Sequence, residues 1–193
     1  MVVCAGLSAF AAARTYKPFS PDAPAFRRQG PDQAKVVIVE FSDLECPACR
    51  VAEGPLRKIL EVYGGKVRFV FKHFPLEMHE HAKTAAIAAE CAGPQGKFWE
   101  YHHLLYDKQA DWAAKDAKAR LDGYATQLKL DLKAWNDCRQ APETAARIAA
   151  DLKDGENALV NSTPTFFING RRFVGAKQLA ELGILQIDRE LRR

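Results

Sequence analysis

Cys46 and Cys49 enclose the dipeptide Pro47-Ala48, and two cysteines at this spacing can interconvert between a dithiol and a disulfide. Two intervening residues let both sulfurs meet across the first turn of a helix. A thiol at the start of a helix has a lowered pKa, because the positive end of the helix dipole stabilises the reactive thiolate. The spacing therefore predicts thiol–disulfide exchange with Cys46 and Cys49 as the catalytic pair.

The segments on either side of this pair have the patterns of a strand and a helix. Residues 36–41 read VVIVEF, a β-branched and aromatic run typical of a strand buried on both faces. Four residues that follow recur at helical spacing, namely Leu56, Ile59, Leu60 and Tyr63. Pro47 suits the first helical position, where an N–H group is not needed. We therefore expect Cys46 at a strand-to-helix turn.

A CxxC pair is also half of many zinc sites, so a metal is the main alternative. Zinc usually requires a second CxxC or paired histidines at short spacing from the first. The other cysteines, Cys4, Cys91 and Cys138, are solitary, and none of the five histidines has such a spacing. The strand before the pair and the helix after it favour redox chemistry. The sequence predicts no metal and no cofactor.

Two histidine pairs lie between the CxxC helix and the C-terminal part of the chain, His79 with His81 and His102 with His103. Residues one or two positions apart on a helix point in different directions, so neither pair forms a ligand face. We expect these four side chains to be solvated. His73 follows an apolar run and receives no role.

Residues 160–175, VNSTPTFFINGRRFVG, have the pattern of a β-hairpin. A strand at 165–168 leads into Asn169-Gly170, which suits a tight turn, and 171–174 return as a second strand. Pro164, just before the first strand, can simply mark where that strand begins. After the strand and CxxC helix, however, this hairpin makes the element order resemble the thioredoxin fold.

Four segments narrow that resemblance to the DsbA-like disulfide oxidoreductases, in a branch found in many bacteria outside the enteric type protein. They are FSDLECPACR (41–50), FKHFPL (71–76), CAGPQGKFWEYHHLLY (91–106) and STPTFFING (162–170). The resemblance covers about residues 25–192. It implies an α/β thioredoxin fold with an inserted α-helical domain. It also implies that Pro164 is cis and faces the disulfide, while Thr163 offers backbone groups to an extended substrate.

This sequence departs from the enteric pattern at two positions. Ala48 stands where the enteric form has histidine, and Thr163 stands where it has valine. Threonine before the proline is found in disulfide isomerases of the same fold. We therefore expect an oxidase milder than the enteric protein, because one donor to the Cys46 thiolate is missing.

The expected organisation has four parts. Residues 1–24 are an N-terminal apolar segment, a signal or anchor remnant, followed by a proline-rich linker. Residues 25–77 and 159–193 form the two parts of the thioredoxin-like domain. Between them, 78–158 carry helical patterns without strand alternation and resemble the helical insertion of DsbA-like proteins. Cys4 suggests a lipid anchor, but Val3 precedes it where a small residue is expected.

Two further residues receive roles through the resemblance. Glu40, six positions before Cys46, corresponds to an acid that lies behind the disulfide and relays protons to the second cysteine; the alternative is a strand-end acid that points to solvent. Cys91 and Cys138 are the only candidates for the second disulfide that some relatives carry in the helical domain. Without that disulfide, they would be two small apolar residues in the core.

Length and composition agree with a single enzyme domain. The chain has 193 residues, 48% of them hydrophobic and 27% charged, and a net charge of +4. These values are ordinary for a globular protein with a sizeable core. The pairs Arg27-Arg28 and Arg171-Arg172 are expected on the solvated surface, and we expect no nucleic-acid partner.

The expected reaction is disulfide donation through a mixed disulfide on Cys46, with Cys49 as the leaving group. The resemblance implies that the partners are unfolded or reduced secreted proteins. It also implies a quinone-linked membrane reoxidant of the DsbB or vitamin K epoxide reductase type. We expect a periplasmic or otherwise extracytoplasmic protein that the N-terminal segment can tether to a membrane.

Two other functions remain open. The first is a disulfide isomerase or reductase of the same fold, which Ala48 and Thr163 would suit. The second is a thioredoxin-fold chaperone or copper-binding module, although such modules usually need a histidine or methionine near the cysteines. A measured reduction potential of the Cys46–Cys49 pair separates these alternatives.

Overall fold

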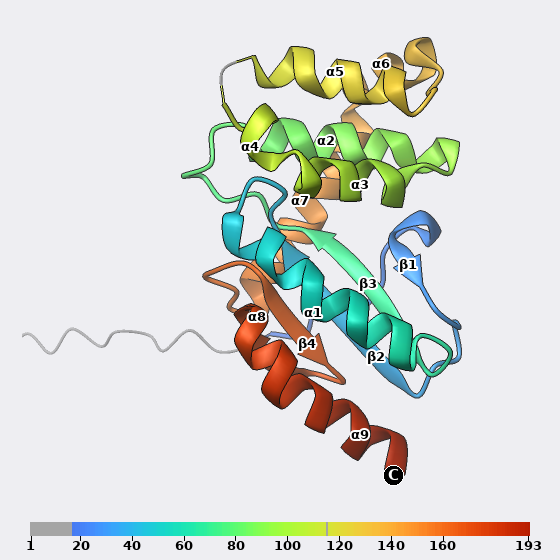
Figure 1. Ribbon diagram of the computed structural model, residues 1–193, viewed down its shortest axis with the longest axis vertical. Helices are drawn as coiled ribbons and strands as arrows, with labels where there is room; N and C mark the ends of the chain where they lie inside the picture. Colours follow the sequence, from blue (N-terminus) through green and yellow to red (C-terminus); the bar gives the residue numbers. More distant parts are fainter. Residues whose placement is uncertain (1–16, 115) are drawn as a thin grey trace, which may run out of the picture.

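The computed structural model describes residues 17–114 and 116–193, so the expectations for Cys4 and the first apolar residues lie outside the described chain. A five-stranded sheet with strand order β1-β3-β2-β4-β5 forms the centre of the molecule (Figure 1). Strands β2 and β3 are parallel, and the other neighbours are antiparallel. The strands are β1 (Arg28–Gln29), β2 (Val36–Ser42), β3 (Val67–His73), β4 (Thr165–Ile168) and β5 (Arg171–Val174).

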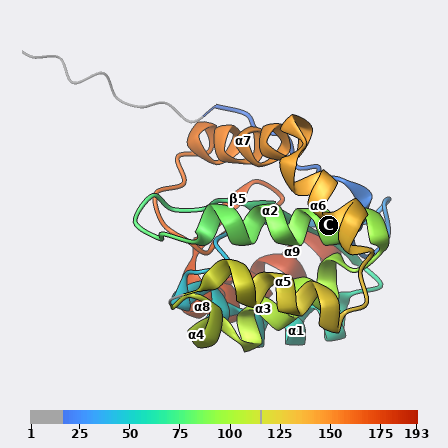
Figure 2. The same ribbon diagram turned by 90° about the horizontal axis from the view of Figure 1, so that it is seen from above.

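Helices cover both faces and one end of this sheet. Figures 1 and 2 show α1 and α8 on one face, α7 on the other, and α2, α3, α5 and α6 stacked beyond the end. The α-helices are α1 (Pro47–Tyr63), α2 (Ala82–Ala92), α3 (Phe98–Asp107), α4 (Gln109–Trp112), α5 (Ala117–Gln127), α6 (Leu132–Gln140), α7 (Pro142–Asn157), α8 (Gly175–Gln178) and α9 (Ile184–Arg192). Shorter segments are the 3-10 turns η1 (Ala25–Arg27) and η2 (Gly93–Gln95) and the π-helical η3 (Leu179–Gly183).

Strand β2 is buried on both faces, as its nearly continuous apolar sequence predicts. Val36 and Ile38 pack into the core beneath α1, whereas Val39 and Phe41 pack into a second core on the opposite face. This division follows the two-residue period of a strand. The segment before β1 closes the second core, because the ring of Phe19 lies 5.3 Å from that of Phe41.

The β4–β5 hairpin has the bounds that its sequence predicts, 165–168 and 171–174. Asn169 and Gly170 form the two-residue turn with φ of 45° and 81°, the left-handed conformations that a tight hairpin turn requires. The Asn169 side chain also holds the turn against β2, because its Oδ1 accepts a hydrogen bond of 2.8 Å from the Val37 amide. The peptide bond between Thr163 and Pro164, just before β4, is cis.

The chain between β3 and β4 is helical, and a disulfide crosses it. Cys91 near the end of α2 and Cys138 in α6 are joined by an S–S bond of 2.04 Å. This is the pairing that the family resemblance implied, so the alternative of two free core thiols is wrong. The bond fixes the two helices over a separation of 47 residues.

A buried network of charges joins these helices to the sheet. Arg27 in η1 forms ion pairs with Asp151 in α7 and with Glu90 in α2, the latter at 3.2 Å. Lys72 in β3 contacts Asp151 at 3.4 Å and Asp154 at 2.7 Å. The expectation that Arg27 is solvated was wrong, because carboxylates that lie more than sixty positions away in the sequence bury its guanidinium.

Candidate active site

The CxxC pair lies where β2 passes into α1. Cys46 is the N-cap residue of this helix, and Pro47 takes the first helical position. Pro47 and Ala48 are exposed, whereas only 7% of Cys46 and 1% of Cys49 are accessible. Cys46 and Cys49 are free thiols. The Cys49 amide donates a 3.1 Å hydrogen bond to the Cys46 carbonyl. The first sulfur is therefore the one that a substrate can reach.

The two thiols differ in acidity. The pKa of Cys46 is lowered to about 5, chiefly by a hydrogen bond from the Cys49 thiol. Hydrogen bonds from Thr163 and from backbone amides of the first helical turn lower it further, against the effect of partial burial. Burial, with the hydrogen bond and charge of Cys46, raises the pKa of Cys49 well above its usual value. At neutral pH the reduced pair consequently holds a thiolate at Cys46 and a thiol at Cys49, which suits Cys46 to act as the nucleophile.

The cis-proline segment faces this pair. The sulfur of Cys46 lies 3.6 Å from the carbonyl oxygen of Thr163. Thr163 is buried beside this sulfur. The structure therefore brings Cys46, Thr163 and Pro164 together, as the resemblance implied.

Glu40 lies beneath the pair in the interior of β2. The strand continues to Ser42 and Glu40 is buried, so the alternative of a strand-end acid that points to solvent was wrong. Burial, and to a smaller extent the charge of Glu53, raises the pKa of Glu40 to about 8. A 2.8 Å hydrogen bond from Ser42 only partly offsets this rise. The charge of Glu40 in turn raises the pKa of Cys49. A carboxyl group that is protonated near neutral pH therefore lies within electrostatic reach of the buried cysteine.

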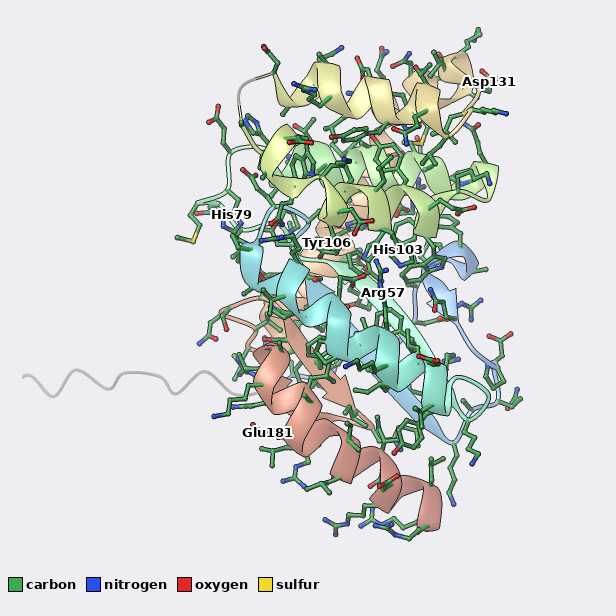
Figure 3. All side chains as sticks on the ribbon, viewed as in Figure 1. Arg57, His79, His103, Tyr106, Asp131 and Glu181 are labelled. Atoms are coloured by element: carbon green, nitrogen blue, oxygen red, sulfur yellow. A yellow bond between two sulfur atoms is a disulfide. The ribbon has the colours of Figure 1, made fainter. Side chains whose placement is uncertain are left out.

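A second polar group, Asp43, lies in the turn before Cys46, where its sequence position indicates a residue that caps or shapes the turn. Its carboxylate accepts hydrogen bonds from the Glu45 amide at 2.8 Å and from the Leu76 amide at 2.9 Å. It also contacts Nδ1 of His79 at 2.7 Å (His79 is labelled in Figure 3). Burial alone lowers the pKa of His79, but the hydrogen bond and charge of Asp43, with the charge of Cys46, raise it. The raised pKa favours the protonated form of His79, whose charge would stabilise a thiolate at Cys46.

Gln109 also supports the turn, and sequence analysis missed it. From α4, its side-chain amide donates to the carbonyl oxygens of Leu44 at 2.8 Å and Cys46 at 3.0 Å. Gln109 is buried. A single polar residue in an irregular helical region gives no signal in the sequence, so only the fold reveals this contact.

The expectation of solvated histidines was wrong for several of these residues. The His79 ring contacts the Asp43 carboxylate at 2.7 Å. His102 is completely buried, packed edge-on against Phe71 at 4.8 Å between ring centroids. His103 is partly buried. The reason for the error is that α3 packs against the sheet along its histidine-bearing side, which the local sequence does not show.

Comparisons with known proteins agree with this geometry. The sequence profile of the family described as Thioredoxin matches residues 22–186. A thioredoxin-like oxidoreductase from Silicibacter pomeroyi is 27% identical with a TM-score of 0.72, over 86% of this chain and 92% of that one. BdbD from Bacillus subtilis is 25% identical with a TM-score of 0.74, over 86% and 93%. Alpha-DsbA1 of Wolbachia pipientis shares the fold, with a TM-score of 0.76 at 22% identity over 89% and 94%.

Curated relatives of another kind share this sequence over part of their length. The Na⁺/H⁺ antiporter NhaA 1 of Salinispora arenicola is 41% identical over 166 residues, which are 86% of this chain and 24% of the antiporter. NhaA 1 of Mycolicibacterium vanbaalenii is 37% identical over 86% of this chain and 26% of its own length. The chain thus spans about a quarter of these relatives. Among the described residues, no helix has the length and apolar character needed to cross a bilayer.

Proposed function

We propose, on the premise that this chain belongs to the DsbA-like family of the thioredoxin fold and is a thiol–disulfide oxidoreductase, that it donates disulfides to proteins outside the cytoplasm. The observation that carries the proposal is the difference in acidity between Cys46 and Cys49. A stabilised Cys46 thiolate favours the reduced pair, and a pair that prefers the reduced state oxidises its substrates.

The reaction has two exchange steps. In the oxidised protein, a substrate thiolate attacks the Cys46 sulfur, a substrate–Cys46 bond forms, and the Cys46–Cys49 bond breaks with Cys49 as the leaving thiolate. A second substrate thiolate then attacks the substrate sulfur of this mixed disulfide, and Cys46 leaves. Two electrons pass from the substrate to the cysteine pair. Of the two substrate protons, one is retained on Cys49 and one is released to solvent, because Cys46 remains a thiolate.

Glu40 is the proton carrier in this scheme. Its pKa of about 8, raised chiefly by burial, leaves it protonated at neutral pH, so it can supply the proton that Cys49 takes up on leaving. In the reverse direction the same carboxylate accepts the Cys49 proton when the pair is reoxidised. Ser42 keeps one carboxylate oxygen of Glu40 in place through its 2.8 Å hydrogen bond.

Thr163 and Pro164 form the substrate-facing wall of the site. The contact between the Thr163 carbonyl and the Cys46 sulfur supports a model in which an extended substrate segment pairs with this backbone, with its own sulfur beside Cys46. The proposed substrates are reduced or unfolded secreted proteins. A quinone-linked membrane protein of the DsbB or vitamin K epoxide reductase type would restore the disulfide, in the periplasm or another extracytoplasmic compartment.

The experiment is to measure the direction of exchange. We expect the oxidised protein to introduce disulfides into a reduced, unfolded secreted protein, and a Cys49→Ser variant to accumulate mixed disulfides on Cys46. Equilibration with glutathione buffers should give a potential more oxidising than that of thioredoxin, which is about −270 mV. A potential at or below the thioredoxin value, with disulfide reduction faster than formation, would support the isomerase or reductase alternative and reject donation.

A further inference from the structure

Glu53 from α1 and the adjacent His102 and His103 from α3 line one pocket between these helices, contrary to the expectation that neighbouring histidines form no ligand face. Each offers one ligand atom, and the three atoms lie within 4.8 Å of one another. We propose that this cluster is a binding site for a divalent transition-metal ion of the zinc class. Two imidazoles and one carboxylate form a protein ligand set that zinc uses, with a fourth position left for water. The inference does not depend on the proposed disulfide donation.

His102 is the strongest observation for a ligand. It is 1% exposed, and neither ring nitrogen has a hydrogen-bond partner among the described residues. A buried imidazole normally donates to a carbonyl or carboxylate group, because an unpaired polar atom in the core is unfavourable. Aromatic rings surround it instead, with Trp99 at 5.3 Å and Tyr106 at 4.9 Å between centroids. A cation bound to one nitrogen would give this side chain the partner it lacks.

Glu53 and His103 are already close to ligand geometry. The Nε2 of His103 lies 3.9 Å from the Oε2 of Glu53. Two ligand atoms at about 2.0–2.1 Å from a tetrahedral zinc ion are about 3.3 Å apart, so this pair needs only a small side-chain adjustment. Glu53 itself is buried, so a cation beside it would stabilise the charged carboxylate that burial disfavours.

The pocket gives an ion both access and room. It has a volume of about 210 Å³, and Gln29, Arg57 and Trp99 line it together with the three proposed ligands. Figure 3 shows Arg57 and His103 at the junction of α1 and α3. The Arg57 side chain is 51% exposed and contacts Glu53 at 3.4 Å. Because it is long and half solvated, Arg57 can leave this contact for solvent when a cation takes its place.

The site is separate from the catalytic sulfurs but lies on the same helix, so the experiment must exclude thiolate ligation. We therefore use the full chain with Cys46–Cys49 oxidised, and titrate it with ZnCl₂ by isothermal calorimetry. We expect one ion per chain. Cobalt(II) absorption provides a second readout, because tetrahedral nitrogen and oxygen ligation gives a visible spectrum without the thiolate charge-transfer band.

Two variants test the ligands, each with a matched control. His103→Ala and Glu53→Gln should each weaken Zn²⁺ binding by about tenfold or more, a loss that even the outer-shell partners of metal ligands can cause. His81→Ala and Glu61→Gln change a histidine outside the cluster and an exposed carboxylate on the same helix. They should leave the affinity within about twofold of the parent protein. Far-UV circular dichroism should show that all four variants are folded.

Three results would overturn the proposal. The first is that the oxidised protein binds no Zn²⁺ at millimolar concentration. The second is that His103→Ala and Glu53→Gln, both folded, bind as tightly as the two controls. The third is a cobalt spectrum with thiolate bands, which in the oxidised protein would assign the ion to Cys4 and not to this cluster. None of these results changes the expected potential of the cysteine pair, so the two proposals fail independently.

Discussion

The sulfur of Cys46 and the carbonyl oxygen of Thr163 are 3.6 Å apart, although 117 positions separate these residues in the sequence. One is the N-cap of a helix, and the other precedes a cis-proline at the start of a strand. Their contact places the reactive sulfur beside a backbone edge that can pair with an extended peptide. Under the proposed function, a protein substrate would approach this thiol from one defined direction.

The acidity of Cys46 predicts selective alkylation. With a pKa of about 5, lowered foremost by the hydrogen bond from Cys49, most Cys46 is ionised at pH 6, whereas burial keeps Cys49 protonated. Iodoacetamide at pH 6 should therefore label Cys46 at least about tenfold faster than Cys49. Peptide mapping by mass spectrometry measures both rates in the reduced protein. Equal labelling, or faster labelling of Cys49, would contradict the assignment.

The exposed Ala48 predicts how oxidising power can be raised. Ala48→His places a donor and a partial positive charge next to the Cys46 thiolate, so the pKa of Cys46 should fall and the potential should rise. A gain of about 1.4 kcal/mol in thiolate stabilisation corresponds to about 30 mV. Ala48→Gln, similar in size but uncharged, is the control and should shift the potential less. An unchanged pKa and an unchanged potential in Ala48→His would show that the dipeptide does not tune this site.

The raised pKa of Glu40 predicts that the free energy of unfolding falls as pH rises. Its pKa rises from an ordinary 4.5 to about 8 in the folded state, mainly through burial. The folded protein thus binds this proton more tightly than the unfolded chain does. The resulting stability is complete below about pH 4.5 and is lost as pH rises towards 8. Glu40→Gln removes the titration, so between pH 5 and pH 8.5 the parent protein should lose about 2–4 kcal/mol more than the variant.

Urea unfolding of the oxidised protein at both pH values measures this difference, because the disulfide removes the titration of the two thiols. Glu61→Gln, an exposed carboxylate on α1, is the control and should follow the parent protein. Parallel stability curves for the parent and Glu40→Gln would show that Glu40 does not bind a proton in this range.

The Cys91–Cys138 disulfide predicts a stability effect that is independent of the redox site. Replacing both residues by alanine frees a loop of 47 residues in the unfolded chain, so the free energy of unfolding should fall by about 3–4 kcal/mol. The potential of the Cys46–Cys49 pair should not change. Denaturation without reductant measures the first effect, and a Cys46→Ala/Cys49→Ala variant serves as the control for removing a cysteine pair. A double variant as stable as the parent protein would refute this prediction.

The buried ion pairs of Arg27 predict a large loss of stability when this one cation is removed. Burial raises the pKa of Glu90, but the hydrogen bond from His73 and the charge of Arg27, with smaller effects of other cations, lower it to about 2. Arg27→Met leaves Glu90 and Asp151 without this partner, so stability at pH 7 should fall by about 3–5 kcal/mol.

The contribution of Glu90 is present above its unfolded pKa of 4.5 and is lost as pH falls towards 2, so the deficit of Arg27→Met should narrow over this range. Thermal unfolding between pH 7 and pH 3 measures it. Arg28→Met is the control, because the ion pairs of Arg28 are with exposed carboxylates and contribute less than about 1 kcal/mol. Equal stability of the two variants would show that the buried pairs contribute nothing.

The parts of this structure that the sequence predicted depend on local signals. The apolar run of β2, the proline after Cys46 and the Asn169-Gly170 turn each act within a few residues, so elements and bounds follow from them. The family resemblance, and not a local signal, predicted that Thr163 and Pro164 lie beside the cysteine pair. The contact between Cys46 and the Thr163–Pro164 segment needs a fold before it can be seen.

The parts that could not be predicted depend on pairs distant in the sequence. Asp43 and His79 are 36 positions apart, and Gln109 reaches back 65 positions to Leu44. His102 looks like any polar helix residue until α3 is packed against the sheet, and that packing buries it completely. Polar residues in such positions have no periodicity, because a single buried contact does not repeat along a helix.

The ion pairs of Arg27 and Lys72 have a consequence for how the molecule moves. Because these cations on the sheet side are bound to carboxylates of α2 and α7, separating the helices from the sheet would expose several charges at once. Separating the two parts is therefore electrostatically unfavourable, and both should exchange their amide protons through one shared opening event.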